Sequence, residues 1–317
     1  MRLFRQIILV VFILPLMGSC ASVNTFPKDF RIESIPAPAA SAEPPMLDVY
    51  VVAADSIVTM DIESYVAGVV AGEMPSDWPL EALKAQAILA RTFVLKFLSE
   101  KDSRYPGADI STDIAEAQAY NADAVNARIL SAVQETAGII LQTEDGSLPY
   151  TWFHAHSGGS TALAQEGIDW QGSEPSYTKI TAGLDSSAAP ESAKAWQAAF
   201  TADAFIAACR DAGADAISCK SVSIAETGPS GRAVTLLVDG VRVNAARLRI
   251  SLGSTVMRST LLTGLTSDGQ QVSMSGKGYG HGVGMPQWGA YALAQEGHTG
   301  EEIALHYYNH VQLIRAW

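Results

Sequence analysis

The sequence predicts an α+β fold in which helices pack on an antiparallel sheet, with a helical insertion at the surface. Apolar residues recur at helical spacing between residues 61 and 100, and apolar and polar residues alternate in several segments after residue 220. Apolar residues make up 48% of the 317-residue chain, which is enough for a sizeable core.

The first twenty residues are predicted to be an export signal outside the fold. Arg2 and Arg5 supply a short positive region, and residues 7–16 form an apolar run too short to span a membrane. The sequence then reads Met-Gly-Ser-Cys, which resembles a bacterial lipoprotein signal ending at Cys20. The resemblance implies cleavage before Cys20 and acylation of its thiol. The alternative is an ordinary signal peptide with an incidental cysteine.

Residues 21–46 contain five prolines among alanines and serines and have no apolar periodicity. This composition predicts a flexible tether that lifts a domain spanning residues 47–317 off a membrane. With a lipid at Cys20, we expect an exported protein anchored in the cell envelope and facing the cell wall. In a cell with two membranes, Ala21 after the cysteine favours the outer membrane.

The folded domain is predicted to begin with a strand at residues 47–52, followed by two helices. Asp61 can cap the first helix, which has apolar side chains at helical spacing and stops at Gly72. The second helix starts at Pro79, a favourable first position, and runs to about residue 100. Because this helix is apolar on nearly every side, we expect it to be buried.

The remaining elements follow from composition and alternation. A third helix is expected at residues 122–137, the alanine-rich residues 185–214 predict the helical insertion, and a last helix at residues 299–308 ends the domain. Strands are expected at residues 138–142, 150–154, 221–225, 233–238, 241–245 and 272–275.

Charge and cysteine content argue against two classes of function. A net charge of −12 without a basic run argues against a nucleic-acid partner, whereas a neutral or sugar-like substrate is compatible. Besides Cys20, the chain has Cys209 and Cys219, ten residues apart. In an oxidising compartment they could form a local disulfide, but spacing alone does not establish the geometry. Neither is expected to be a nucleophile.

Glu73 is the first candidate catalytic residue. It lies in the stretch Gly-Glu-Met-Pro between the two predicted helices. A loop glutamate in water and a catalytic acid both fit this position. The nearby carboxylate of Asp77 is interpreted as a cap of the second helix. Arg91, inside that helix, needs a partner, so it either forms an internal ion pair or contacts the substrate.

Residues 153–161 read Phe-His-Ala-His-Ser-Gly-Gly-Ser-Thr. On a strand, His154 and His156 would share one face. They could hold zinc with His281 or His306 as a third ligand. The alternative is a pair of neutral histidines that form hydrogen bonds with the neighbouring serines and threonine.

Residues 276–289 hold six glycines, interleaved with aromatic and polar side chains. Glycine at this density permits positive φ and a close approach of the backbone to a ligand. The lysine and hydroxyl of a phosphate loop are absent at the required spacing. Rings beside hydrogen-bonding groups suit a groove for sugars; the alternative is a tightly wound loop that packs its own aromatic residues.

These segments together resemble the stage II sporulation protein D family. The resemblance lies in Gly-Glu-Met-Pro at 72–75 and Leu-Lys-Ala-Gln-Ala-Ile-Leu-Ala-Arg-Thr at 83–92. The histidine-containing segment resembles the family's His-Ser-x-Ser-Gly-Gly-x-Thr element. Gly-Tyr-Gly-His-Gly-Val-Gly-Met-Pro-Gln-Trp-Gly-Ala at 278–290 and His-Tyr-Tyr at 306–308 resemble its C-terminal signature. The match runs in order through residues 47–317.

The resemblance implies a peptidoglycan lytic transglycosylase or a wall-bound modifier of an amidase. It assigns the catalytic acid to Glu73. With the polar residues of the glycine-rich segment added, the expected substrate-binding residues are Arg91, His154, Ser157, Thr161, Tyr279, His281 and Gln287. The expected partners are glycan strands, which the family suggests must first lose their stem peptides, and a cell-wall amidase.

One departure from the family's pattern affects the cofactor. Some members carry Cys-Asp-x-x-His-Cys-Gln-x-Tyr, a metal-binding stretch, where residues 112–120 here read Thr-Asp-Ile-Ala-Glu-Ala-Gln-Ala-Tyr. Both cysteines and the histidine are missing, so we expect no metal and no other cofactor. Sporulation itself is not implied, because homologues occur in bacteria that form no spores.

Overall fold

The computed structural model describes residue 35 and residues 43–317. The predicted export signal and nearly all of the predicted tether lie outside the described residues, as does Cys20. Within the described part of the chain, no helix is both long and apolar enough to cross a membrane.

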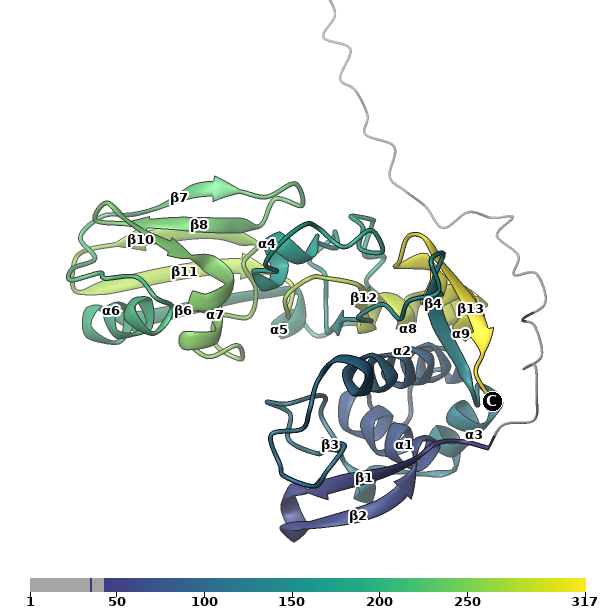
Figure 1. Ribbon diagram of the computed structural model, residues 1–317. Helices are drawn as coiled ribbons and strands as arrows, with labels where there is room; N and C mark the ends of the chain where they lie inside the picture. Colours follow the sequence, from purple (N-terminus) through teal and green to yellow (C-terminus); the bar gives the residue numbers. More distant parts are fainter. Residues whose placement is uncertain (1–34, 36–42) are drawn as a thin grey trace, which may run out of the picture.

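The α+β class is confirmed. Helices and several small sheets, most of them antiparallel, surround two separate hydrophobic cores (Figure 1). We call them the first core, built by the N-terminal and C-terminal parts of the chain, and the second core, built by residues 196–274.

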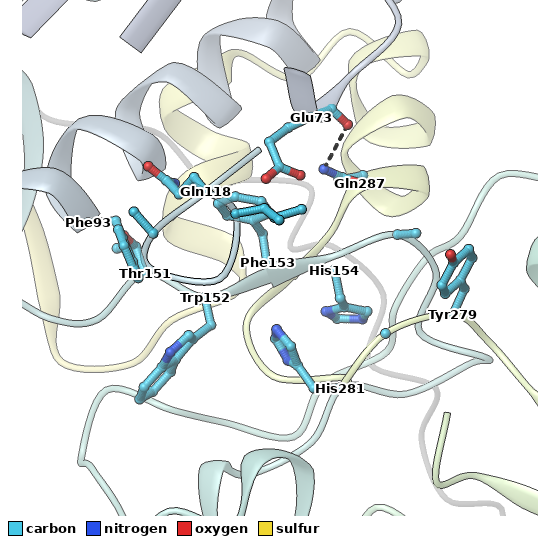
Figure 2. A pocket seen from close by; sticks show the side chains of 14 residues that line it. Glu73, Phe93, Gln118, Thr151, Trp152, Phe153, His154, Tyr279, His281 and Gln287 are labelled. Carbon is cyan, nitrogen blue, oxygen red and sulfur yellow. Dashed lines mark hydrogen bonds between the residues drawn. The ribbon is translucent and has the colours of Figure 1, made fainter. Parts of the chain in front are cut away.

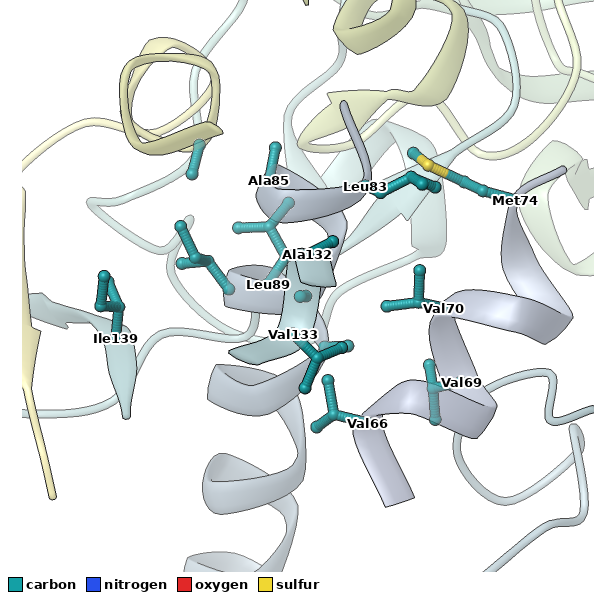
Figure 3. Close-up of a cluster of buried hydrophobic side chains, with 14 of the residues drawn as sticks. Val66, Val69, Val70, Met74, Leu83, Ala85, Leu89, Ala132, Val133 and Ile139 are labelled. Atoms are coloured by element: carbon teal, nitrogen blue, oxygen red, sulfur yellow. The ribbon is translucent and has the colours of Figure 1, made fainter. Parts of the chain in front are cut away.

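The first core is centred on two consecutive helices. It contains Val66, Val69 and Val70 of α1 and Leu83 of α2, and Val133 of α3 lies beside Val66 (Figure 3). The C-terminal helices and strand return to cover α2. The elements of this part are β1 (Met46–Val51), β2 (Ser56–Asp61), α1 (Ile62–Glu73), α2 (Leu80–Glu100), β3 (Ile110–Ser111), α3 (Ala127–Glu135), β4 (Ile139–Thr143), α8 (Gln287–Gln295), α9 (Gly300–His306) and β13 (Val311–Arg315), with 3-10 turns at Val52–Ala54 and Ala122–Ala124.

The second core lies between two antiparallel three-stranded sheets and two helices. One sheet has the order β10-β11-β6 and the other β7-β8-β9. The elements are α5 (Glu191–Lys194), β6 (Ala195–Thr201), α6 (Ala202–Asp211), β7 (Val222–Thr227), β8 (Ala233–Val238), β9 (Val241–Asn244), α7 (Ala245–Ser251), β10 (Leu262–Ser267) and β11 (Gln271–Lys277). Cys209 and Cys219 are buried in this core as free thiols.

Between the two cores, the histidine-containing and glycine-rich segments lie side by side. Strand β5 (Phe153–His154) pairs in parallel with β12 (Met285–Pro286), and the short helix α4 (Ala164–Ile168) follows. His156 and Tyr279 extend the contact through two backbone hydrogen bonds of 3.0 and 2.8 Å.

Three expectations about the elements were wrong. The insertion expected at residues 185–214 is not all helical, because its middle forms β6, which pairs with β11. The helix at the C-terminus does not end the domain, since β13 follows and pairs with β4. Asp77 does not cap α2; Pro79 occupies the cap position, without a side-chain hydrogen bond. Asp61 does cap α1, accepting the Ser64 N–H at 3.0 Å.

Candidate functional site

A cavity of about 290 Å³ opens where α1 ends, beside β5 and the glycine-rich segment (Figure 2). It brings together five of the eight residues predicted for the site. These five are Glu73, His154, Tyr279, His281 and Gln287; the other lining residues are Phe93, Ile114, Ala117, Gln118, Thr151, Trp152, Phe153, Ala155 and Gly280.

Glycines on α1 allow the loop before Asn121 to approach Glu73. A Cβ on Gly68 would lie 2.2 Å from the Tyr120 ring, and one on Gly72 would lie 2.7 Å from the backbone of Ala119 and Tyr120. The two glycines are four residues apart and therefore share a helix face. The loop is fixed there by the Asn121 N–H, which donates to Gly68 O at 2.9 Å.

Glu73 is the last residue of α1, and its carboxylate faces the cavity wall. Its Oε1 accepts the backbone N–H of Ala119 at 2.8 Å, and Gln287 Nε2 donates to its main-chain oxygen at 3.2 Å. Burial raises the pKa of Glu73 above the ordinary glutamate value, while the hydrogen bond from Ala119 and the nearby Gln287 amide act in the opposite direction. Because the C-terminal end of a helix disfavours negative charge, α1 also supports the protonated form.

His154 and His281 are both neutral and have opposite tautomers. His154 Nδ1 lies 3.2 Å from Val283 O, which can only accept, so its Nε2 is unprotonated. That Nε2 is buried at the cavity and has no hydrogen-bond partner. The His281 Nδ1 accepts the Val283 N–H at 3.0 Å, so its proton is on Nε2. Burial lowers the pKa of His154 well below its usual value and that of His281 to about 3.

Alternate glycines let the glycine-rich segment lie against β5. Gly280 and Gly284 have φ of 117° and 70°, which favour glycine. A Cβ on Gly280 would lie 2.5 Å from His154 Cβ, and one on Gly284 would lie 1.9 Å from Trp152 O. The high glycine content therefore serves close backbone packing, and Tyr279 and His281 reach the cavity as a result.

Arg91 is not at the cavity, which corrects the prediction that it binds substrate. It is fully buried, and its guanidinium pairs with Glu63 at 2.5 Å and donates to Ile139 O at 3.0 Å. Glu63 and Glu73 are ten residues apart on α1, which corresponds to about 15 Å along the axis. The structure therefore gives Arg91 the internal ion pair that was its alternative role.

Ser157 and Thr161 also lie away from the cavity lining. Ser157 is buried and donates its hydroxyl to Asp185, whose Oδ1 accepts the Ser157 N–H at 2.9 Å. Thr161 donates to Lys179 O at 2.9 Å. Their polar groups are used within the loop, so they shape the segment that carries His154 rather than contact a ligand in the cavity.

The histidines do not form the zinc site considered from the sequence. His154 bonds to the main chain, whereas the His156 Nδ1 accepts the Gly158 N–H at 3.0 Å and lies 3.5 Å from Asp185. Among the described residues, no three His, Cys, Asp or Glu side chains come together in a way that could hold a metal ion.

Sequence reasoning missed the wall of the cavity opposite β5. Gln118 lies in the stretch that was compared only for metal ligands, and Phe93 is in the helix from which Arg91 was chosen. No signal in the sequence pointed to Gln118. Its neighbour Ala119 contacts α1 at Gly72 only in the folded protein, and no spacing rule links these two segments.

Comparison with known proteins gives the family. The family model described as "Stage II sporulation protein" matches residues 51–142, which include Glu73 and the loop that contacts it. An uncharacterized protein of Brachyspira hyodysenteriae is 31% identical over 80% of this chain and 67% of its own length. The stage II sporulation protein D of Bacillus subtilis is 29% identical over 93% of this chain and 85% of its own length. The chain belongs to the stage II sporulation protein D family.

A further relative of this chain has a different name. The amidase enhancer of Bacillus subtilis is 28% identical over 76% of this chain, which covers 39% of that longer protein. The relatives therefore include proteins named for sporulation and a protein named for its effect on an amidase.

Proposed function

We propose that this protein acts at the cell wall as a peptidoglycan lytic transglycosylase. It cuts the bond between N-acetylmuramic acid and N-acetylglucosamine and leaves 1,6-anhydro-N-acetylmuramic acid ends. Glu73 is the general acid and then the general base. Membership of the stage II sporulation protein D family supports a role at the wall.

The observation that carries this proposal is the single carboxylate of the cavity. Glu73 is the one acidic residue among the 14 that line it. Hydrolysing glycosidases use two carboxyl groups, about 5–10 Å apart. A cavity with one buried carboxyl group, whose pKa is raised, suits a reaction in which the same group gives and then takes a proton.

In the proposed reaction, protonated Glu73 donates its proton to the glycosidic oxygen, and the bond from that oxygen to C1 of the muramic acid breaks. The 6-hydroxyl oxygen of the same sugar then bonds to C1, and its proton passes to the Glu73 carboxylate. No water is consumed, and Glu73 ends in its starting protonation state. His154 Nε2, as a free acceptor, and Tyr279 can bind hydroxyl groups of the sugar.

The test replaces Glu73 by glutamine and measures the anhydro ends released from purified peptidoglycan by mass spectrometry. Glu73→Gln keeps the size and the ability to accept the Ala119 N–H, but it cannot exchange a proton, so we expect product formation to fall by about 10²-fold or more. The control is Asp77→Asn, which changes the nearest exposed carboxylate in the α1–α2 joint and should retain full activity. Both intact wall and wall stripped of stem peptides should be used, because the family suggests that the stripped form is the substrate.

An alternative function is favoured by the amidase enhancer among the relatives. In that case the cavity binds glycan without cutting it and promotes the action of a cell-wall amidase. Adding an amidase to the same assays separates the two: an enhancer would raise amidase activity equally with Glu73 or Gln at this position, and neither protein would release anhydro ends. Full cutting activity in Glu73→Gln would contradict the transglycosylase mechanism.

We also propose that the protein is exported and held in the cell envelope by a lipid on Cys20. The tether of residues 21–46 would then let the catalytic part reach the wall from the membrane. Replacement of Cys20 by serine should release the protein from the membrane fraction without changing its activity on purified wall.

A further inference from the structure

The wall of the cavity next to Glu73 is formed by a loop with a buried amide. Gln118 is 3% exposed, and neither its Oε1 nor its Nε2 has a hydrogen-bond partner. Hydrogen bonds fix the loop on both sides of this residue. The Thr112 N–H donates to Tyr50 O at 3.0 Å, and the Ala119 N–H donates to the Glu73 carboxylate. Gln118 is therefore held at a defined place beside the candidate catalytic carboxyl group.

The N–H groups of the Gln118 amide lack an acceptor, and its carbonyl oxygen lacks a donor. Burying such a group without hydrogen bonds costs free energy, and a ligand that satisfies it recovers that cost on binding. One group that offers both complementary partners in a single plane is another amide, whose N–H donates to Oε1 and whose C=O accepts from Nε2.

We propose that Gln118 binds the acetamido group of an N-acetylated sugar next to the scissile bond, and so makes the site specific for N-acetylated glycans. This inference rests on the proposed glycan substrate. Gln118 lines the cavity, and a change of its side-chain rotamer is the movement by which its amide would reach the sugar. Phe93 and Trp152, which also line the cavity, supply apolar surface for the acetamido methyl group. Figure 2 shows Gln118 between Glu73 and Phe93.

A second buried glutamine provides a control that distinguishes a role of Gln118 in ligand binding from a purely structural role. Gln86 in α2 is fully buried and likewise has no partner for either amide atom, but it does not line the cavity. Replacement of either glutamine by methionine removes an unsatisfied polar group and keeps a similar volume, so neither change should lower the melting temperature. Only the change at Gln118 should alter ligand binding.

The test is calorimetric titration of the full-length protein with two uncharged tetrasaccharides. The β-1,4-linked N-acetylglucosamine tetramer carries acetamido groups, and the β-1,4-linked glucose tetramer carries hydroxyl groups in their place. We expect the parent to prefer the N-acetylated tetramer. Gln118→Met should weaken binding of that tetramer about tenfold while leaving binding of the glucose tetramer unchanged. Gln86→Met should bind both as the parent does.

Gln118→Asn, which keeps the amide but shortens its reach, serves as a second variant and should show the same selective loss. The proposal is overturned if Gln118→Met keeps the preference or weakens both sugars equally. In those cases glycan binding persists and the proposed function stands. If the parent binds neither tetramer, the inference fails together with its glycan substrate, whereas activity retained by Glu73→Gln overturns only the cutting mechanism.

Discussion

At the scale of single residues, the position of Glu73 at a helix C-terminus decides its chemistry. Its carboxyl group belongs to the last residue of α1, so it lies at the C-terminal end of that helix. Burial and the helix end both favour the protonated form, and within the described part of the chain Ala119 and Gln287 oppose them. In the folded protein this acid therefore holds its proton to a higher pH than a glutamate in water.

The first prediction at this scale concerns pH. Since the acid form starts the reaction, kcat/KM should fall as pH rises through the pKa of Glu73, which lies above 4.5. The same sign applies to stability: the contribution of Glu73 to the free energy of unfolding is present at low pH and is lost as pH rises through its folded-state pKa.

Removing Gln287 tests the cause of the shift. Gln287→Leu deletes a contact that lowers the pKa of Glu73, so the descending limb of the pH–rate profile should move to higher pH. Gln295→Leu, at the exposed far end of α8, should leave the limb where it is. A limb that stays in place in Gln287→Leu would show that this side chain does not tune the acid.

At the scale of elements, the close contact between α1 and the loop at Ala119 positions the carboxyl group. Gly68 and Gly72 leave α1 without side chains at two successive turns of one face, and the loop lies against these positions. The backbone N–H that bonds to Glu73 comes from this loop. These two glycines therefore determine where the backbone donor to Glu73 lies.

Gly72→Ala is the corresponding prediction. Alanine in place of glycine within a helix ordinarily stabilises by about 1 kcal/mol. Here the new Cβ would lie 2.7 Å from backbone atoms that cannot move cheaply, so the loop must shift away. We expect the Ala119 hydrogen bond to be lost, kcat/KM to fall about tenfold and the pH limb to move upward. A variant with parental activity and a higher melting temperature would contradict this account.

The same elements show what could be predicted from the sequence. Local signals predicted α1, its cap at Asp61 and the length of α2, because capping and helical spacing are properties of neighbouring residues. Strand β6 was mistaken for a helix because its alanines favour helix, although Trp196 and the alternating burial pattern fit a strand; pairing with β11 overrides the propensity.

Only those site residues that lie in recognisable sequence motifs were predicted. Glu73, His154 and the glycine-rich segment converge as expected, because each lies in an unusual local sequence. Arg91 and Ser157 were assigned to substrate through the family resemblance, and a sequence does not show which internal partner satisfies such a group. Gln118 was missed because a sequence does not show that a polar side chain lacks a partner; this appears only in the folded protein.

At the scale of the whole molecule, buried ionic and polar contacts connect distant parts of the chain. Arg232, at the second core, donates to Ser157 O at 2.7 Å and to Ser160 O at 3.0 Å, which ties that core to the histidine-containing segment. Glu63 has an equivalent role in the first core. It accepts from Arg91, from the Gly138 N–H and from Trp317 Nε1, the last two at 3.0 Å.

The last prediction concerns this Glu63 cluster, in which one carboxylate joins α1, α2, the start of β4 and the C-terminal residue. Arg91→Met leaves Glu63 without its counter-charge in a largely buried position and should lower the free energy of unfolding in urea by about 3–5 kcal/mol. The double variant Arg91→Met, Glu63→Met should lose less than the sum of the two single changes, because the charge is removed together with its partner. At a temperature where Arg91→Met remains folded, it should bind the N-acetylated tetramer as tightly as the parent, since Arg91 lies at the opposite end of α1 from Glu73. If Arg91→Met keeps the parental stability but loses glycan binding, Arg91 contacts the substrate and the ion-pair role is contradicted.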